Sequence, residues 1–204
     1  MKAVQRSFWL KQLYQWHWIS AALSLVTMLG FAITGITLNH ASGLSAQPVV
    51  TTQKGLLPEA LLAVIEIPAE PVTRPLPEVL KLWLTQEMSL DLANKPAEWS
   101  DEEIYLSIPR PGGDAWLSID LANGDIVYEA TFRGQVSYFN DLHKGRDTGN
   151  AWRWFMDIFA IACIIFCITG LVMMQFHAER RPATWPLTGM GFVAPLLVVI
   201  LFIH

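Results

Sequence analysis

Four of the five histidines lie at the ends of long apolar segments, where an imidazole could bind haem iron. His17 and His40 flank the first segment, and His143 and His177 flank the second. An ionisable side chain at the edge of a membrane span is a functional candidate, and neutral imidazole is a usual axial ligand of haem. The four histidines therefore indicate metal or haem chemistry at a membrane. The competing interpretation is that each contacts only lipid headgroups or a backbone carbonyl.

The apolar segments are long enough to cross a bilayer as helices. Residues 13–38 contain no acidic or basic side chain apart from His17, and further apolar runs cover residues 152–176 and 187–203. A bilayer core of about 30 Å requires about 20 helical residues. The third run, with 17 residues, is at the lower limit. A hydrophobic content of 52% agrees with an integral membrane protein of three transmembrane helices.

The distribution of basic residues predicts the orientation of these helices. Residues 1–11 contain three basic and no acidic residues, and Arg180 and Arg181 follow the second span. By the positive-inside rule both segments face the cytoplasm. Residues 41–150 would then lie in the periplasm of a Gram-negative cell, on a multi-pass protein of the inner membrane. If the third run crosses, the C-terminus faces outside.

This topology groups the histidines into two pairs. His17 and His177 lie near the cytoplasmic face, and His40 and His143 lie near the periplasmic face. His17 and His40 are 23 residues apart, which is about 34 Å and a net rotation of about 140° along an ideal helix. Electron transfer over this distance requires haem rings directed inward or an additional carrier. His40 could also lie just beyond the helix end.

The segment between the first two spans predicts a small α+β module. Residues 41–75 are rich in Ser, Thr, Gln and Pro, with a short helix-like piece at 57–65. An amphipathic helix is expected at 77–86, followed by a three-stranded meander with strands at 104–108, 116–120 and 126–132. Asn123-Gly124 is a strong hairpin-turn signal. The chain is thus divided into residues 1–40, 41–150 and 151–204.

A short internal repeat relates the two long spans. Trp16-His17-Trp18 opens the first and Phe31-Ala32-Ile33-Thr34-Gly35 lies near its end; Trp152-Arg153-Trp154 and Phe166-Cys167-Ile168-Thr169-Gly170 occupy the same places in the second. Parallel sequences in oppositely running helices suggest an inverted pair. Gly35 and Gly170 would let a helix or a haem face approach closely. Chance recurrence of Trp and Thr-Gly pairs is the alternative.

The charged stretch before the second span has two interpretations. Asp141, His143 and Asp147 could bind a metal ion at the outer face, since carboxylate and imidazole suit iron. A solvated loop with ordinary charges is the preferred interpretation.

Several function classes are excluded by missing signals. The net charge of -4 gives no footprint for nucleic acid. The sequence contains no Gly-rich nucleotide fingerprint, no Ser-His-Asp spacing and no His-Glu-x-x-His motif. A self-contained flavin or NADPH reductase is therefore not expected. The electron donor would be quinol or a separate cytoplasmic protein.

The motifs WHWIS at residues 16–20 and NDLHKGR at 140–146, together with the two Thr-Gly pairs, resemble the PepSY-associated transmembrane proteins. The helix and strands at about 76–132 are similar to a PepSY module. The resemblance covers most of the chain, and the Asp-Leu-His-Lys-Gly stretch is its most specific part.

The resemblance implies a function in iron chemistry. Longer members of the family are bacterial inner-membrane proteins tied to iron and siderophore uptake, and some bind haem and act as ferric reductases. It implies His17, His40, His143 and His177 as ligands of haem b, with one or two haems per chain or a haem shared in a homodimer. This chain departs from the longer members by having three spans, and a homodimer would restore a larger bundle.

We therefore predict a haem-containing electron-transfer protein, with possible oxidoreductase activity as a membrane ferric reductase. Electrons would pass from quinol or a cytoplasmic donor to ferric iron or a ferric chelate in the periplasm. One alternative is a non-enzymatic membrane anchor whose periplasmic module binds a partner protein. Another is a metal-handling accessory that uses the outer histidines without haem.

Overall fold

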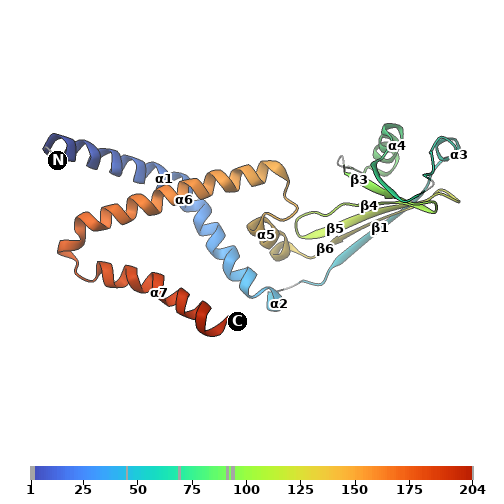
Figure 1. Cartoon of the computed structure of the whole chain (residues 1–204). Coiled ribbons are helices and arrows are strands. Elements are labelled where there is room, and N and C mark those ends of the chain that lie inside the picture. Colours follow the sequence, from blue (N-terminus) through green and yellow to red (C-terminus); the bar gives the residue numbers. More distant parts are fainter. Residues whose placement is uncertain (1–2, 45, 69, 91, 93–94, 204) are drawn as a thin grey trace. The chain divides into compact units, whose positions relative to one another are not determined.

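The computed structural model describes residues 3–44, 46–68, 70–90, 92 and 95–203 (Figure 1). It divides into two compact units. The first contains the chain up to Gly30 and the chain after Arg153, and the second contains Phe31–Arg153. The first long helix contributes to both units.

Three helices are long and apolar enough to cross a membrane: α1 (Ala3–Asn39), α6 (Gly149–His177) and α7 (Thr184–Phe202). They confirm the three predicted spans, and α7 with its 19 residues is slightly longer than expected. Most of their large apolar side chains are exposed, and none of the described residues of α7 is buried. A helix that is apolar on all sides is suited to contact with lipid or with another membrane helix.

A six-stranded antiparallel sheet lies in the sequence between α1 and α6. Its strands, in spatial order, are β1 (Val49–Leu56), β6 (Asp125–Phe132), β5 (Gly113–Asp120), β4 (Glu103–Ser107), β3 (Pro96–Trp99) and β2 (Val72–Pro75). Each neighbouring pair is antiparallel. The alternation at residues 104–108 is confirmed, since Ile104 and Leu106 point into the core.

The helix α4 (Glu78–Met88) packs on the sheet, with α3 (Glu59–Leu62) beside it in the same core. Leu80 and Leu84 of α4 are buried against residues such as Trp99 and Leu117. The amphipathic helix predicted at 77–86 is therefore confirmed. Its buried leucines belong to the core of the sheet, and α4 lies beside the sheet in Figure 1.

The predicted three-stranded meander is only the middle of the sheet. No strand was predicted within residues 41–75, where the structure has β1 and β2, and β3 was also not predicted. β1 pairs along its whole length with β6, and its Val and Thr residues carried a β-branched strand signal. β2 and β3 contain Pro75 and Pro96, which face each other at the end of the ladder. Proline is tolerated at the end of a strand, but it weakens the sequence signal.

The stretch before the second span is a helix and not a solvated loop. α5 covers Gln135–Lys144 and ends at Gly145, whose left-handed backbone (φ 66°) terminates it. Asn140 and Asp141 are buried. The preferred interpretation of Asp141 as an ordinary loop charge was therefore wrong, because its carboxylate is buried against the turn between β4 and β5. A four-residue helix, α2 (Ala41–Leu44), follows α1.

Candidate functional site

His17 is held on α1 by three residues of α6. Its Nδ1 lies 2.9 Å from the Thr169 hydroxyl. Its ring stacks on Phe166, with centroids 4.7 Å apart and an interplanar angle of 18°. A Cβ added at Gly170 would lie 3.4 Å from His17 Cε1, in ordinary van der Waals contact, so the ring packs directly beside this glycine. The half-buried imidazole thus sits on one side of the sequence Phe166-x-x-Thr169-Gly170.

His143 is held in the same way by the matching sequence of α1. Its Nδ1 lies 2.7 Å from the Thr34 hydroxyl. Its ring lies against Phe31, with centroids 4.9 Å apart and a tilt of 40°. A Cβ at Gly35 would lie 3.6 Å from His143 Cε1. We call each arrangement a histidine clamp: Phe166, Thr169 and Gly170 around His17, and Phe31, Thr34 and Gly35 around His143.

Further hydrogen bonds fix α5, which carries His143. The Thr37 hydroxyl of α1 donates to Asn140 Oδ1 at 2.9 Å. The Trp152 indole donates to the Leu142 carbonyl, also at 2.9 Å. The position of His143 is therefore determined by contacts on both sides of it in the sequence.

Asp141 connects α5 to the sheet. Its Oδ2 accepts a hydrogen bond of 2.8 Å from the backbone N–H of Gly112, in the turn between β4 and β5. Gly112 has φ +73°, and a Cβ there would lie 2.8 Å from Tyr138 Cα, so only glycine fits. Arg146 Nε lies 3.9 Å from Asp141 Oδ1. The sheet and the helix with His143 are thus one folded unit.

His177 and His40 are both exposed and bond to their own helices. His177 Nδ1 lies 2.8 Å from the Met173 carbonyl, and His40 Nδ1 lies 3.0 Å from the Ile36 carbonyl. A carbonyl only accepts, so Nδ1 is the donor in both rings, and in the neutral ring Nε2 then carries the lone pair. His40 follows directly on the last residue of α1, which agrees with the expectation that it could lie beyond the helix end.

One groove, here called the histidine groove, brings two predicted ligands together. It has a volume of about 870 Å³ and is lined by residues that include His17, His177, Phe166, Met173, Arg180 and Arg181. By contrast, no hydrogen bond or ring contact joins His40 to His143 within the described residues. The pairing of those two histidines stays a prediction.

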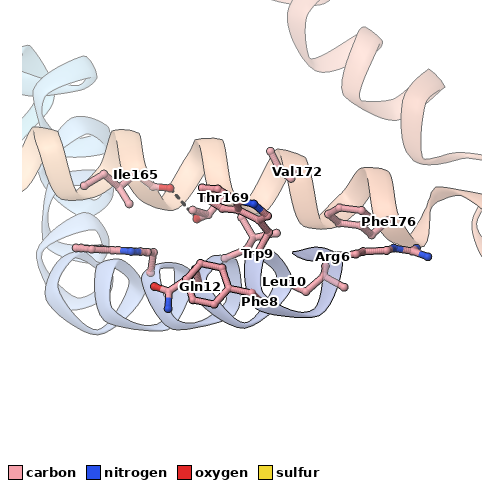
Figure 2. Close-up of a pocket in the computed structure, with 11 residues that line it drawn as sticks. Arg6, Phe8, Trp9, Leu10, Gln12, Ile165, Thr169, Val172 and Phe176 are labelled. Atoms are coloured by element: carbon pink, nitrogen blue, oxygen red, sulfur yellow. Dashed lines mark hydrogen bonds between the residues drawn. The ribbon is translucent and has the colours of Figure 1, made fainter. Parts of the chain in front are cut away.

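A second groove, the tryptophan groove, lies between the start of α1 and the end of α6 (Figure 2). It has a volume of about 780 Å³, and its lining includes Trp9, Trp16, Gln12, Val172 and Phe176. Thr169, which bonds to His17, also lines this groove. The hydrogen-bonded pair of Thr169 and His17 therefore contributes one residue to each groove.

The alternative of a metal site at the outer face gains no support. Across residues 3–203, apart from positions 45, 69, 91, 93 and 94, no group of three or more His, Cys, Asp or Glu side chains could hold a metal ion. Asp147 instead lies 3.6 Å from Arg146 as an ion pair. A haem requires only one or two protein ligands, so this finding does not bear on it.

The threonines are the site residues whose role sequence reasoning missed. From the sequence, the glycines of the repeated Phe-x-x-Thr-Gly were expected to let a helix or a haem face approach closely. In the structure the threonine of each pair bonds to a histidine ring, and the glycine lies beside that ring. The repeat also aligned Trp16-His17-Trp18 with Trp152-Arg153-Trp154, whereas the residue that corresponds to His17 by its contacts is His143.

Comparison with protein-family models matches residues 8–204 to the PepSY_TM-like family. No curated protein and no solved structure gives a significant match. The matched region includes almost all of α1, the sheet, α6 and α7. The chain therefore belongs to the PepSY-associated transmembrane family.

Proposed function

We propose that the protein binds haem b and transfers electrons across the bacterial inner membrane, from quinol or a cytoplasmic donor to ferric iron or a ferric chelate in the periplasm. The observation that carries the proposal is the histidine groove, in which two predicted ligands, His17 and His177, line one cavity beside two arginines. The residues of the groove can be tested against the chemical groups of haem.

The size, walls and charges of the groove support haem as its ligand. Ligand sites commonly have volumes of about 300–1,000 Å³ with mostly apolar walls, and the groove has about 870 Å³. Phe166, Leu171 and Met173 supply apolar walls. Arg180 and Arg181 suit the two propionate carboxylates, since guanidinium binds carboxylate through paired hydrogen bonds.

The hydrogen bonds of the histidines also fit iron ligation. Metal-bound histidines usually donate one ring N–H to a neighbouring acceptor, which orients the ring and raises the basicity of the other nitrogen. Nδ1 has such a neighbour in His17 and in His177. No described residue hydrogen-bonds to Nε2 of either ring, so this nitrogen is available. When bound, haem would supply one-electron exchange between ferric and ferrous iron.

The chain's own residues would bind haem and shape its surroundings. Nε2 of His17 and His177 would donate its lone pair, and the apolar walls would exclude water and so tune the potential. His40 and His143, which belong to the end of α1 and to α5, are the candidate ligands for the periplasmic face. The lining of the tryptophan groove supports a membrane-borne donor such as quinol, because an apolar cavity at the membrane admits an isoprenoid molecule.

The test is the absorption spectrum and the haem-to-protein ratio of the full-length protein, purified after expression with ample haem supply. We expect a Soret band in the wild type and its loss or a marked decrease in His17→Ala and His177→Ala. Met174→Leu, which changes a groove residue at constant volume, is the matched control and should keep the band. A colourless wild-type protein would overturn the proposal and favour the membrane anchor.

A further inference from the structure

We propose that Thr169 and Thr34 are positioning residues, which hold His17 and His143 in the tautomer with the proton on Nδ1 and so present the Nε2 lone pair to a metal. The assignment follows from counting hydrogens in the two clamps. Its relevance to haem rests on the proposed function, but the tautomer itself does not.

The Thr169 hydroxyl has one hydrogen, and two backbone carbonyls of α6 lie within hydrogen-bond distance to accept it. Oγ1 lies 2.7 Å from the Ile165 carbonyl and 3.0 Å from the Phe166 carbonyl. Carbonyl oxygens only accept, and threonine within a helix commonly donates to the carbonyl four residues earlier. The hydroxyl hydrogen is then used within α6. At 2.9 Å from His17 Nδ1 the hydroxyl can act only as the acceptor, so Nδ1 carries the proton.

The same count applies to the clamp of His143. Thr34 Oγ1 donates to the Phe31 carbonyl at 3.1 Å. It lies 2.7 Å from His143 Nδ1, so the imidazole is again the donor. His40 and His177 reach the same tautomer through backbone carbonyls. All four predicted ligands therefore share one arrangement of protons, although two different kinds of acceptor produce it.

Each clamp also restricts the ring. Phe166 covers one face of the His17 ring, and Gly170 lies beside Cε1. A Cβ at Gly170 would lie 3.4 Å from Cε1, which is ordinary van der Waals contact, so the ring packs directly beside this position. Threonine supplies the hydrogen bond, phenylalanine the stacking surface and the glycine position a side contact. The recurrence of this arrangement at His143 is independent support for a positioning role.

The tautomers can be measured in the full-length protein without haem, labelled with ¹⁵N-histidine in a detergent or nanodisc at slightly alkaline pH. The ¹⁵N shifts distinguish a protonated ring nitrogen from an unprotonated one, and His17→Gln and His143→Gln assign the signals. We expect Nδ1–H in both rings of the wild type. Thr169→Val should change the populations of His17 alone, Thr34→Val those of His143 alone, and the two serine variants should restore them.

Wild-type signals with Nε2–H for His17 or His143 would overturn the assignment, even if a valine variant failed to fold. Haem affinity gives the second readout. Loss of an outer partner of a ligand typically weakens metal binding about 10–100-fold, so Thr169→Val should weaken haem binding by this factor and Thr169→Ser should not. If Thr169→Val changed the tautomer of His17 but not the affinity for haem, Thr169 would have no positioning role in haem binding. A wild type with the expected tautomers and no haem would refute the proposed function alone.

Discussion

Asp141 joins the sheet to the histidine-bearing helix α5 through a buried hydrogen bond. The side chain is almost completely buried, and its carboxylate accepts the Gly112 N–H. Replacement by alanine would leave this N–H without an acceptor, at a cost of about 1–3 kcal/mol. We expect Asp141→Ala to lower the free energy of unfolding by about this amount, measured by urea titration of the full-length protein in detergent.

Two further variants serve as controls for the stability loss expected in Asp141→Ala. Asp141→Asn keeps an acceptor oxygen and should lose less stability than Asp141→Ala. Gln135→Ala, at an exposed position of the same helix, should change stability by no more than about 0.5 kcal/mol. Equal stability of Asp141→Ala and Gln135→Ala would show that the bond to Gly112 contributes nothing.

Among the elements, α4 shows how periodicity in the sequence becomes packing. Leu84 is fully buried against the sheet, whereas Leu82 on the opposite side of the helix is 59% exposed. Truncation of a buried leucine typically costs about 2–5 kcal/mol through lost burial and cavity formation. Leu84→Ala should destabilise the sheet by this amount and Leu82→Ala by much less, as measured by tryptophan fluorescence during urea unfolding. Similar losses in both variants would contradict the packing of α4.

The membrane helices present the opposite situation. α1, α6 and α7 expose most of their large apolar side chains, and α1 and α6 meet through the His17 clamp and the walls of the two grooves. Without an aqueous hydrophobic effect inside a bilayer, such helices associate through close packing and hydrogen bonds. The Thr169–His17 bond is therefore both a contact between helices and part of the candidate site.

For the molecule as a whole, the proposed orientation places the sheet in the periplasm and the turn after α6 in the cytoplasm. A cysteine at exposed Asp101, near the sheet, and one at exposed Glu179, after α6, form a matched pair in a chain whose Cys163 and Cys167 are replaced by alanine. We expect a membrane-impermeant maleimide to label Asp101→Cys in intact cells, and Glu179→Cys only after lysis. The reverse pattern would overturn the orientation.

Electron transfer across the whole protein gives the last prediction. If the periplasmic histidines bind haem, His40→Ala and His143→Ala should reduce the rate at which intact cells reduce a ferric chelate that enters the periplasm to that of cells without the protein. Lys144→Ala, an exposed neighbour on α5, should keep the wild-type rate. An unchanged rate in both histidine variants would count against a periplasmic haem.

Much of the architecture was accessible from the chain alone, because it depends on local patterns. The spans at residues 13–38 and 152–176 follow from hydropathy over about 20 residues, and β4, β5 and β6 follow from alternation and turn signals. β2 and β3 were not predicted, because strands of four residues with proline have little periodic signal in the sequence. α5 was not predicted, because its buried positions include the polar residues Asn140 and Asp141, which interrupt the apolar pattern of a buried helix face.

The histidines at the ends of the spans and the repeated Phe-x-x-Thr-Gly sequences can be read directly from the chain. That each threonine holds a histidine cannot. His17 and Thr169 are 152 residues apart, and Thr34 and His143 are 109 apart. No local preference encodes which distant hydroxyl meets which ring; packing of α6 on α1, and of α5 on the end of α1, brings these groups together. The same packing converts a repeated sequence into two histidine clamps.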